Sequence, residues 1–295
     1  MHIRMSDMQS FMDCPRQWYL TRYRGLTSPE KPGLYAPTSR DIGSTVDLAM
    51  RGYYWDGKDP SSTIRALAEE RSFSEEETHP GWADVYATSA RMMEGYLEWL
   101  ADTGSDHGEV TVGVELELEA EIIPGVFIHG HLDRLVFDTN FDDFIVDDTK
   151  TVDQIPKSEL FDINFQLLTY IWLLRKIGIE ASRGRHTYLR RVKRTGRANP
   201  PFYARSDIFV NDVQMANHEE HLKVLVHRIV DATYCLNCSP GTPEESGLYP
   251  HVTRDCEWKC PVKSVCVSMS SDTREVSERV VSGMLVPYER STPGA

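Results

Sequence analysis

The fold of this chain is decided by one short stretch, Phe144-Ile145-Val146-Asp147-Asp148-Thr149-Lys150-Thr151. Its first three residues are apolar, as in a strand that is buried on both faces. Because side chains alternate between the faces of a strand, Asp148 and Lys150 point to one side and Asp147 points to the other. The stretch therefore predicts a buried central strand that ends in a charged site.

Further strands and helices are predicted on both sides of this stretch. Residues 110–118 alternate as a strand should, and a turn at Pro124-Gly125 separates them from a second strand over residues 126–137. With residues 144–149 these strands predict an antiparallel meander. The remaining predictions are helices over residues 6–24, 42–102, 159–176 and 211–234, and strands over residues 184–192 and 201–209.

Local signals mark where some of these helices begin and end. Ser6 is a candidate N-cap, and Gln9 would complete a capping box. Gly25 and Gly178 are candidate C-terminal stops. We expect one domain over residues 1–295, with a helical insertion at 26–102, the core at 105–210, a cysteine-rich segment at 235–266 and a tail at 267–295.

The overall composition is that of an ordinary globular protein, but its charge is acidic. The chain has 295 residues, 40% hydrophobic, and a net charge of −13. This charge argues against DNA binding over the whole surface, but it does not exclude a local basic track beside an acidic metal site. We find no apolar run long enough to span a membrane and no signal peptide, so we expect a cytoplasmic protein without a membrane partner.

A second aspartate is expected close to the charged end of the central strand. Asp133 lies on the neighbouring strand of the meander, and with Asp148 it can supply the oxygen ligands that Mg²⁺ prefers. Lys150 can orient the attacking water and neutralise charge that develops on a phosphate. Gln166 and Tyr170 follow one turn apart on one face of the next helix. The alternative is a surface hairpin with solvated charges.

Taken together, these motifs resemble those of a known family. A Gly-x-x-Asp strand, a strand ending in Asp-x-Lys-Thr and a helix with Gln-x-x-x-Tyr are the pattern of the PD-(D/E)xK nucleases, and more narrowly of their RecB-like, CRISPR-associated exonuclease branch of phages and prokaryotes. The opening Ser6…Cys14-Pro15-Arg16 is also similar, and the resemblance runs to Cys266. It implies a restriction-endonuclease-like α/β fold, in which helices flank a twisted mixed sheet, and one nuclease domain with its catalytic core at 105–210.

The resemblance also implies an activity and roles for the site residues. The activity is metal-dependent hydrolysis of DNA by an exonuclease, with single strands favoured, in recombination, repair or the processing of viral or CRISPR DNA. Asp133 and Asp148 would bind Mg²⁺ or Mn²⁺, Lys150 would be the catalytic lysine, and Gln166 and Tyr170 would support the site or contact DNA. The sequence does not identify a helicase or recombination partner.

One residue departs from the pattern of the family. Its helix with Gly-x-x-x-His corresponds here to Gly43…Asp47, so an aspartate stands where the histidine would ligate metal. Asp47 can still coordinate Mg²⁺ or Mn²⁺, and a solvated helix residue is an equal alternative. A catalytically weakened module that binds nucleic acid or a partner is therefore the second function to consider.

The cysteines form a second candidate site. By the same resemblance, Cys14, Cys256, Cys260 and Cys266 would ligate a 4Fe–4S cluster and form a C-terminal clamp that joins the two ends of the chain. The three-residue gap between Cys256 and Cys260 is one longer than usual. The alternative is structural Zn²⁺, because the spacing of Cys235, Cys238, Cys256 and Cys260 is close to that of a zinc ribbon.

A short basic stretch stands out against the acidic chain. It is predicted as a hairpin with Gly196 near its tip, and no acidic residue lies within it. Such a stretch suits contacts with the phosphates of single-stranded DNA, and a solvated hairpin is the alternative. The candidate contacts are Arg185, Arg190, Arg191, Lys193 and Arg194.

Overall fold

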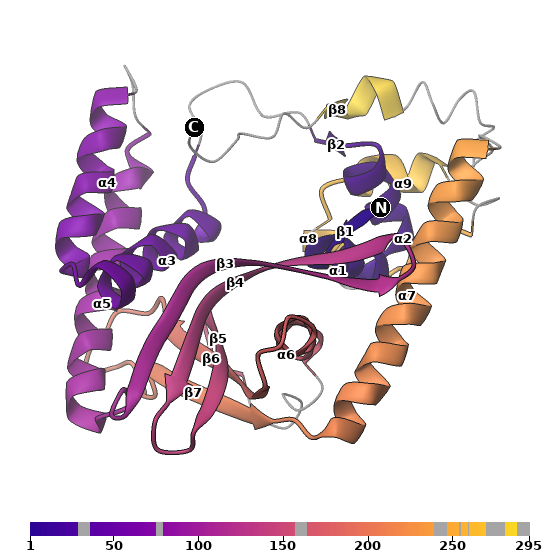
Figure 1. The fold of residues 1–295 in the computed structure, drawn as a ribbon. Helices are drawn as coiled ribbons and strands as arrows, with labels where there is room; N and C mark the ends of the chain where they lie inside the picture. The colour runs from indigo at the N-terminus through magenta and orange to yellow at the C-terminus, as the bar shows by residue number, and fades with distance from the viewer. Residues whose placement is uncertain are drawn as a thin grey trace. The chain divides into compact units, whose positions relative to one another are not determined.

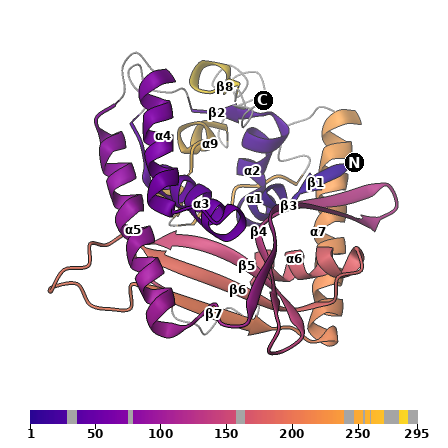
Figure 2. The same ribbon diagram turned by 60° about the vertical axis from the view of Figure 1, so that its left-hand side comes forward.

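The structure is a computed structural model that describes residues 1–28, 36–74, 79–156, 164–238, 247–253, 255–258, 260–269 and 281–287. The chain divides into two compact units (Figures 1 and 2). Unit 1 comprises Met1–Pro32, Glu121–Ile128 and Glu219–Ala295, and unit 2 comprises Gly33–Ala120 and His129–His218. The single domain expected from the sequence stays a prediction.

Unit 2 contains a mixed sheet with helices packed against it. In its described residues the strands follow the order β4-β5-β6-β7, and β3 pairs with β4. The β4–β5 and β6–β7 pairs are antiparallel, and the central β5–β6 pair is parallel. The strands are β3 (Glu109–Ile123), β4 (Val126–Asp138), β5 (Asp143–Val152), β6 (Ala181–Arg190) and β7 (Tyr203–Phe209), of which β3 and β4 extend into unit 1.

The helices of unit 2 form two groups. Three of them pack on one another (Figure 2). They bury a shared core that includes Val46, Met93 and Tyr96. A separate helix packs against β5 and β6. The first group is α3 (Ser39–Asp56), α4 (Pro60–Ser74) and α5 (Gly81–Thr103), and the separate helix is α6 (Phe165–Lys176). This is the mixed α/β sheet flanked by helices that the sequence predicts, with the helical insertion before the strands.

Local sequence signals explain where these helices begin and end. Thr38 and Asp41 form a capping box at the start of α3, which ends at Gly57 in a left-handed conformation. The Asn164 side chain accepts a hydrogen bond from the Leu167 amide and caps α6. Residues 157–163, where the sequence predicts the first part of this helix, lie outside the described residues.

Unit 1 holds the N-terminal helices and the cysteines. Its β1 (His2–Arg4) pairs with the beginning of β4, and β2 (Leu26–Thr27) pairs with β8 (Val286–Pro287). The β2–β8 pair lies partly in the predicted tail, and no sequence motif indicated it. Its helices are α1 (Met5–Asp13), α2 (Pro15–Trp18), the π-helix η1 (Tyr19–Tyr23), α8 (Asp255–Trp258), α9 (Lys263–Met269) and all but the first turns of α7 (Asp212–Cys238).

Two predictions about the N-terminal helix are wrong. The helix begins at Met5 after Arg4, no side chain caps it, and Gln9 donates to Asp13 instead of closing a capping box with Ser6. It is also not continuous to residue 24, because Cys14 is extended (φ −162°, ψ 110°). The ring of the following Pro15 disfavours helical geometry at that position.

No helix in the described part of the chain is long and apolar enough to cross a membrane. The cytoplasmic location stays a prediction.

Candidate active site

The candidate site lies entirely in unit 2, where the polar end of β5 meets α6, β4, β6 and α3. Asp148 is 1% exposed, although it is a carboxylate. Its Oδ2 lies 2.6 Å from Lys150 Nζ and 3.0 Å from His186 Nδ1, and its Oδ1 accepts a hydrogen bond from Gln166 Nε2 at 2.9 Å. The Lys150 ammonium also donates to Gln166 Oε1 at 3.0 Å. A buried carboxylate with partners on three sides is held in one orientation.

Asp133 completes the pair of carboxylates expected from the meander. It precedes Arg134, which pairs across the sheet with Asp147, and its Oδ2 accepts a hydrogen bond from the Thr149 amide at 2.9 Å. Burial, together with the charge of Asp148, raises the pKa of Asp133 to about 8. The hydrogen bond from the Thr149 amide lowers this pKa, but its effect is smaller than that of Asp148. Because the charge of Asp148 disfavours the ionised form of Asp133, a cation between them would stabilise the site.

Asp47 also belongs to this group of carboxylates. It lies on α3, and burial together with the charges of Glu115 and Asp148 raises its pKa to about 7. Asp47 is half-buried and lines a cavity with Glu115 and Asp133, which favours the ligand over the solvated helix residue. Tyr170 lies at the edge of the site, where its hydroxyl donates to the carbonyl of His131 and burial raises its pKa.

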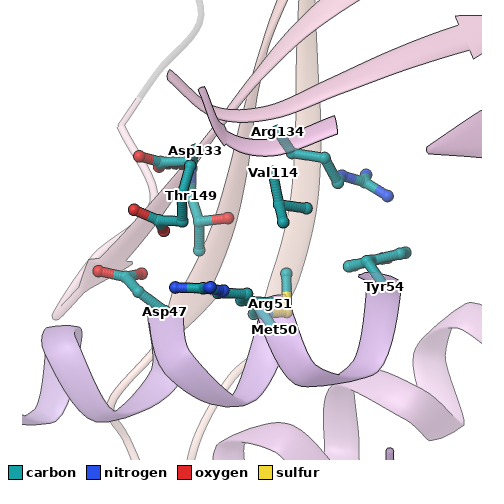
Figure 3. A pocket seen from close by; sticks show the side chains of 9 residues that line it. Asp47, Met50, Arg51, Tyr54, Val114, Asp133, Arg134 and Thr149 are labelled. Atoms are coloured by element: carbon teal, nitrogen blue, oxygen red, sulfur yellow. Dashed lines mark hydrogen bonds between the residues drawn. The ribbon is translucent and has the colours of Figure 1, made fainter. Parts of the chain in front are cut away.

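A small cavity lies between α3 and the strands (Figure 3). Its volume is about 20 Å³, which is the scale of one water molecule or one bare cation. Three carboxylates contribute to its wall, from Asp47, Glu115 and Asp133. Arg51 also lines it, and Figure 3 shows its side chain extending along α3 toward Asp47.

A family comparison decides which proteins this site belongs with. The model of the PD-(D/E)XK nuclease superfamily matches residues 3–267. The chain belongs to this superfamily.

Two solved structures are among those similar to this chain, both at low sequence identity. The protein SSO0001 has 20% identity and a TM-score of 0.34, over 77% of this chain and 85% of that chain. A protein from Eubacterium rectale described as a "Putative exonuclease" has 11% identity and a TM-score of 0.47, over 81% of this chain and 86% of that chain. A search of curated proteins finds no match. Both TM-scores are below 0.5, so the membership rests on the family model.

Nucleases of this superfamily generally use Mg²⁺ or Mn²⁺, and the donor set fits such a cation. Carboxylate oxygens line a cavity of the right size, and burial together with the charges of neighbouring carboxylates raises the pKa values of Asp47 and Asp133. Within the described residues, however, no three His, Cys, Asp or Glu side chains already stand close enough to hold a metal ion. A cation would have to draw the carboxylates of this nuclease together.

Three residues around the site were not assigned to it from the sequence. His186 reaches Asp148 because β6 lies parallel to β5 with these two residues in register. Glu115 is one of several alternating glutamates on β3, and its φ of +52° sets it apart from an ordinary strand residue. Arg51 lies one turn after Asp47 on α3. None of these positions can be found without the register of the strands or the packing of α3.

The predicted basic track is largely neutralised by acids from elsewhere in the nuclease. Arg185 is 5% exposed and forms ion pairs with Asp207 and Glu109, so its assignment as a DNA contact is wrong. These acidic partners lie outside the basic stretch, on β7 and β3, so the sequence of the stretch alone does not reveal them. Arg190 donates to the backbone carbonyls of Asp153, Asn199 and Pro201.

The remaining residues of the predicted track lie at the surface. Arg191 pairs with Asp153, and Arg194 pairs with Glu98. Both acids are more than half exposed, and such pairs are readily exchanged for other partners. Lys193 is exposed. For these three residues a contact with DNA stays a prediction.

Four of the six cysteines lie near one another in unit 1. Burial raises the pKa of the Cys266 thiol, Arg16 lowers it, and the charges of Cys14, Cys260 and Cys256 raise it. The backbone amides of His251 and Thr253 donate to the sulfurs of Cys14 and Cys256, each at 3.4 Å. Cys235 and Cys238 are exposed at the end of α7, which extends four residues beyond the helix predicted to end at residue 234.

Proposed function

We propose that this chain is a Mg²⁺- or Mn²⁺-dependent DNA exonuclease. It would hydrolyse phosphodiester bonds from an end, preferably in single strands, during recombination, repair or the processing of viral or CRISPR DNA. The observation that supports this most is the arrangement of Asp133, Asp148 and Lys150 at the end of β5, in a chain whose family model covers residues 3–267.

In this proposal Asp47, Asp133 and Asp148 hold the cation. When bound, it would polarise the phosphodiester and lower the pKa of a bound water. Gln166 and His186 keep the Asp148 carboxylate in one orientation through hydrogen bonds to different oxygens. Because the carboxylate is already oriented, cation binding requires little reorganisation of this side chain.

Lys150 has the second part of the reaction in this proposal. Its ammonium is 2.6 Å from Asp148, while its side chain is still 37% exposed. It can therefore reach a phosphate that enters from solvent and neutralise the negative charge that develops on it. Hydrolysis replaces the bond from phosphorus to the leaving oxygen with one from phosphorus to the water oxygen, and the leaving oxygen takes up a proton.

An assay with variants and two DNA forms tests this function. Protein purified without oxygen is incubated with Mg²⁺, Mn²⁺ or chelator, and with single-stranded DNA that is either linear and end-labelled or circular. We expect metal-dependent loss of the linear substrate only, with a drop of at least about 100-fold in Asp148→Asn and Lys150→Ala. Cutting of the circle would contradict the exonuclease assignment, and the position of the label gives the polarity.

Matched controls separate the site from general loss of charge. Asp102 and Lys58 are exposed residues of unit 2 outside the site, so Asp102→Asn and Lys58→Ala should retain wild-type activity. If the wild type cuts neither substrate but binds DNA, the catalytically weakened binding module takes the place of the enzyme. Asp47 stands where the family has a histidine, so Asp47→His is then the first variant to test for recovery of activity.

We further propose a 4Fe–4S cluster held by Cys14, Cys256, Cys260 and Cys266. The electrostatic coupling of these four thiols and the amides that point at two of their sulfurs support it. No three of the described thiols stand at metal-binding distance as they are, so the cluster would draw them together. The exposed positions of Cys235 and Cys238 weigh against the zinc alternative. Such a cluster would be structural, as a clamp between the ends of the chain.

A further inference from the structure

Arg51 is an exposed cation on the wall of the cavity in the candidate active site. It lies four residues after Asp47 on α3, so both side chains project from the same side of the helix. Asp47, Glu115 and Asp133 line the same cavity, and Figure 3 shows the Arg51 side chain extending toward this group. An arginine at this place meets any group that approaches the carboxylates.

The other cations of the site are already held by carboxylates. Arg134 is buried against Asp147, and Lys150 is bonded to Asp148 and Gln166. Among the residues that the structure describes, Arg51 has no hydrogen bond or ion pair from its guanidinium, and it is exposed. Its donors are therefore directed to solvent beside the cavity.

A DNA strand that reaches this site meets an unfavourable field. The chain carries a net charge of −13, and the cavity wall itself holds three carboxylates. Contacts to phosphate oxygens fix the register of a nucleic acid on a protein, and arginine makes them with paired donors in one plane. A single arginine beside the carboxylates would hold the phosphate where the cation can act on it.

We propose that Arg51 binds a phosphate of the substrate strand next to the bond that is cleaved. It is a positioning residue, and the inference rests on the proposed nuclease function for its substrate. The alternative role for the same geometry is that of a counter-charge for the carboxylates before a cation binds. The two roles differ in what happens to DNA binding when the charge is removed.

The test compares Arg51→Ala, Arg51→Lys and a control, Arg65→Ala, which removes an exposed arginine of α4 that lines neither the site nor its cavity. The affinity for a single-stranded oligonucleotide is measured over a series of salt concentrations with Ca²⁺, a hard divalent ion chosen to occupy the site in place of Mg²⁺. Mn²⁺ affinity is measured separately by calorimetry without DNA. Steady-state kinetics with Mg²⁺ completes the set.

We expect Arg51→Ala to weaken oligonucleotide binding roughly tenfold and to reduce the slope of log K against log salt by about 0.7, the value for one phosphate contact to a single strand. Arg51→Lys should recover the slope, because it keeps the charge, and Arg65→Ala should match the wild type. In kinetics KM should rise more than kcat falls. Mn²⁺ affinity should not fall in any variant.

A slope in Arg51→Ala equal to that of the wild type overturns the inference. Tighter Mn²⁺ binding with that unchanged slope would identify Arg51 as a counter-charge. The proposed function is tested separately by the wild type. If the wild type does not cleave and the slope still falls in Arg51→Ala, the phosphate contact stands without the enzyme. If it cleaves and the slope does not change, the enzyme stands without the contact.

Discussion

Asp147 and Asp148 are neighbours on β5 with opposite surroundings. Asp148 faces the polar side chains of α6 and the site, whereas Asp147 faces away and lies against Arg134 and Thr187. Burial would raise the pKa of Asp147, but the guanidiniums of Arg134, Arg205 and Arg185 outweigh it and hold this pKa below its usual range. The same residue type thus serves a proposed cation site on one face and a buried ion-pair network on the other.

The structural role of Asp147 predicts a large effect on stability. Asp147→Asn leaves Arg134 buried without its carboxylate, and we expect a loss of about 3–5 kcal/mol in the free energy of unfolding. Because the folded pKa is depressed, the contribution of Asp147 is present above the usual aspartate pKa and is lost as the pH falls through the folded value. The difference between variant and wild type should therefore shrink below about pH 4.

Urea unfolding measures this difference at neutral and acid pH. Asp56→Asn is the control, because Asp56 forms a similar pair with Lys58 at the exposed surface, where we expect a change below about 1 kcal/mol. Equal losses in the two variants would show that Asp147 is not held as the structure indicates.

At the scale of the elements, the strands were more predictable than the ends of the helices. The alternation in residues 110–118 and the apolar start of β5 each predicted a strand, and the structure has both strands. Burial follows the pattern at Ile145 and Val146 of β5, whereas Val110 and Val112 of β3 are exposed. The break at Cys14 and the π-helix after it depend on local competition that the apolar spacing does not record. His186 and Glu115 required the register of β6 with β5 and the packing of α3, which no short motif contains.

The contact between β4 and α6 gives a prediction for Gly130. A Cβ at this buried glycine would lie 2.9 Å from Leu173 Cδ1 and 3.1 Å from Tyr170 Cε1. Gly130→Ala must therefore shift the buried side chains of Leu173 and Tyr170 on α6, and we expect a loss of about 1–3 kcal/mol in the free energy of unfolding. Nuclease activity should also fall, because the same helix holds Gln166 against Asp148.

Chemical denaturation and the cleavage assay together check this prediction. Gly196→Ala provides the matched control, since a Cβ there has no atom within 4 Å, and its stability should change by less than about 0.5 kcal/mol. An unchanged midpoint in Gly130→Ala would mean that α6 does not pack on β4 at this distance.

At the scale of the whole molecule, charge and chain ends matter most. The net charge of −13 gave no sign of either the acidic site or the basic residues. Of the five basic residues predicted to contact DNA, Arg185 proved to balance a buried acid, Glu109. Unit 1 is assembled from both ends of the chain. Cys14 belongs to the first of these segments and Cys266 to the last, so a group that binds both would close a very long loop.

If a cluster closes this loop, the iron content and the thermal stability of the protein should both depend on the cysteines that hold it. Protein purified without oxygen should contain about four iron atoms per chain, with acid-labile sulfide. Cys14→Ser and Cys266→Ser should lose the iron and unfold at a lower temperature, because the ends of unit 1 are then no longer joined. Cys235→Ser and Cys238→Ser, which change exposed thiols at the end of α7, should keep both the iron and the wild-type Tm. If metal analysis instead finds zinc, lost in Cys235→Ser and retained in Cys14→Ser, the zinc alternative is correct and the clamp does not include Cys14.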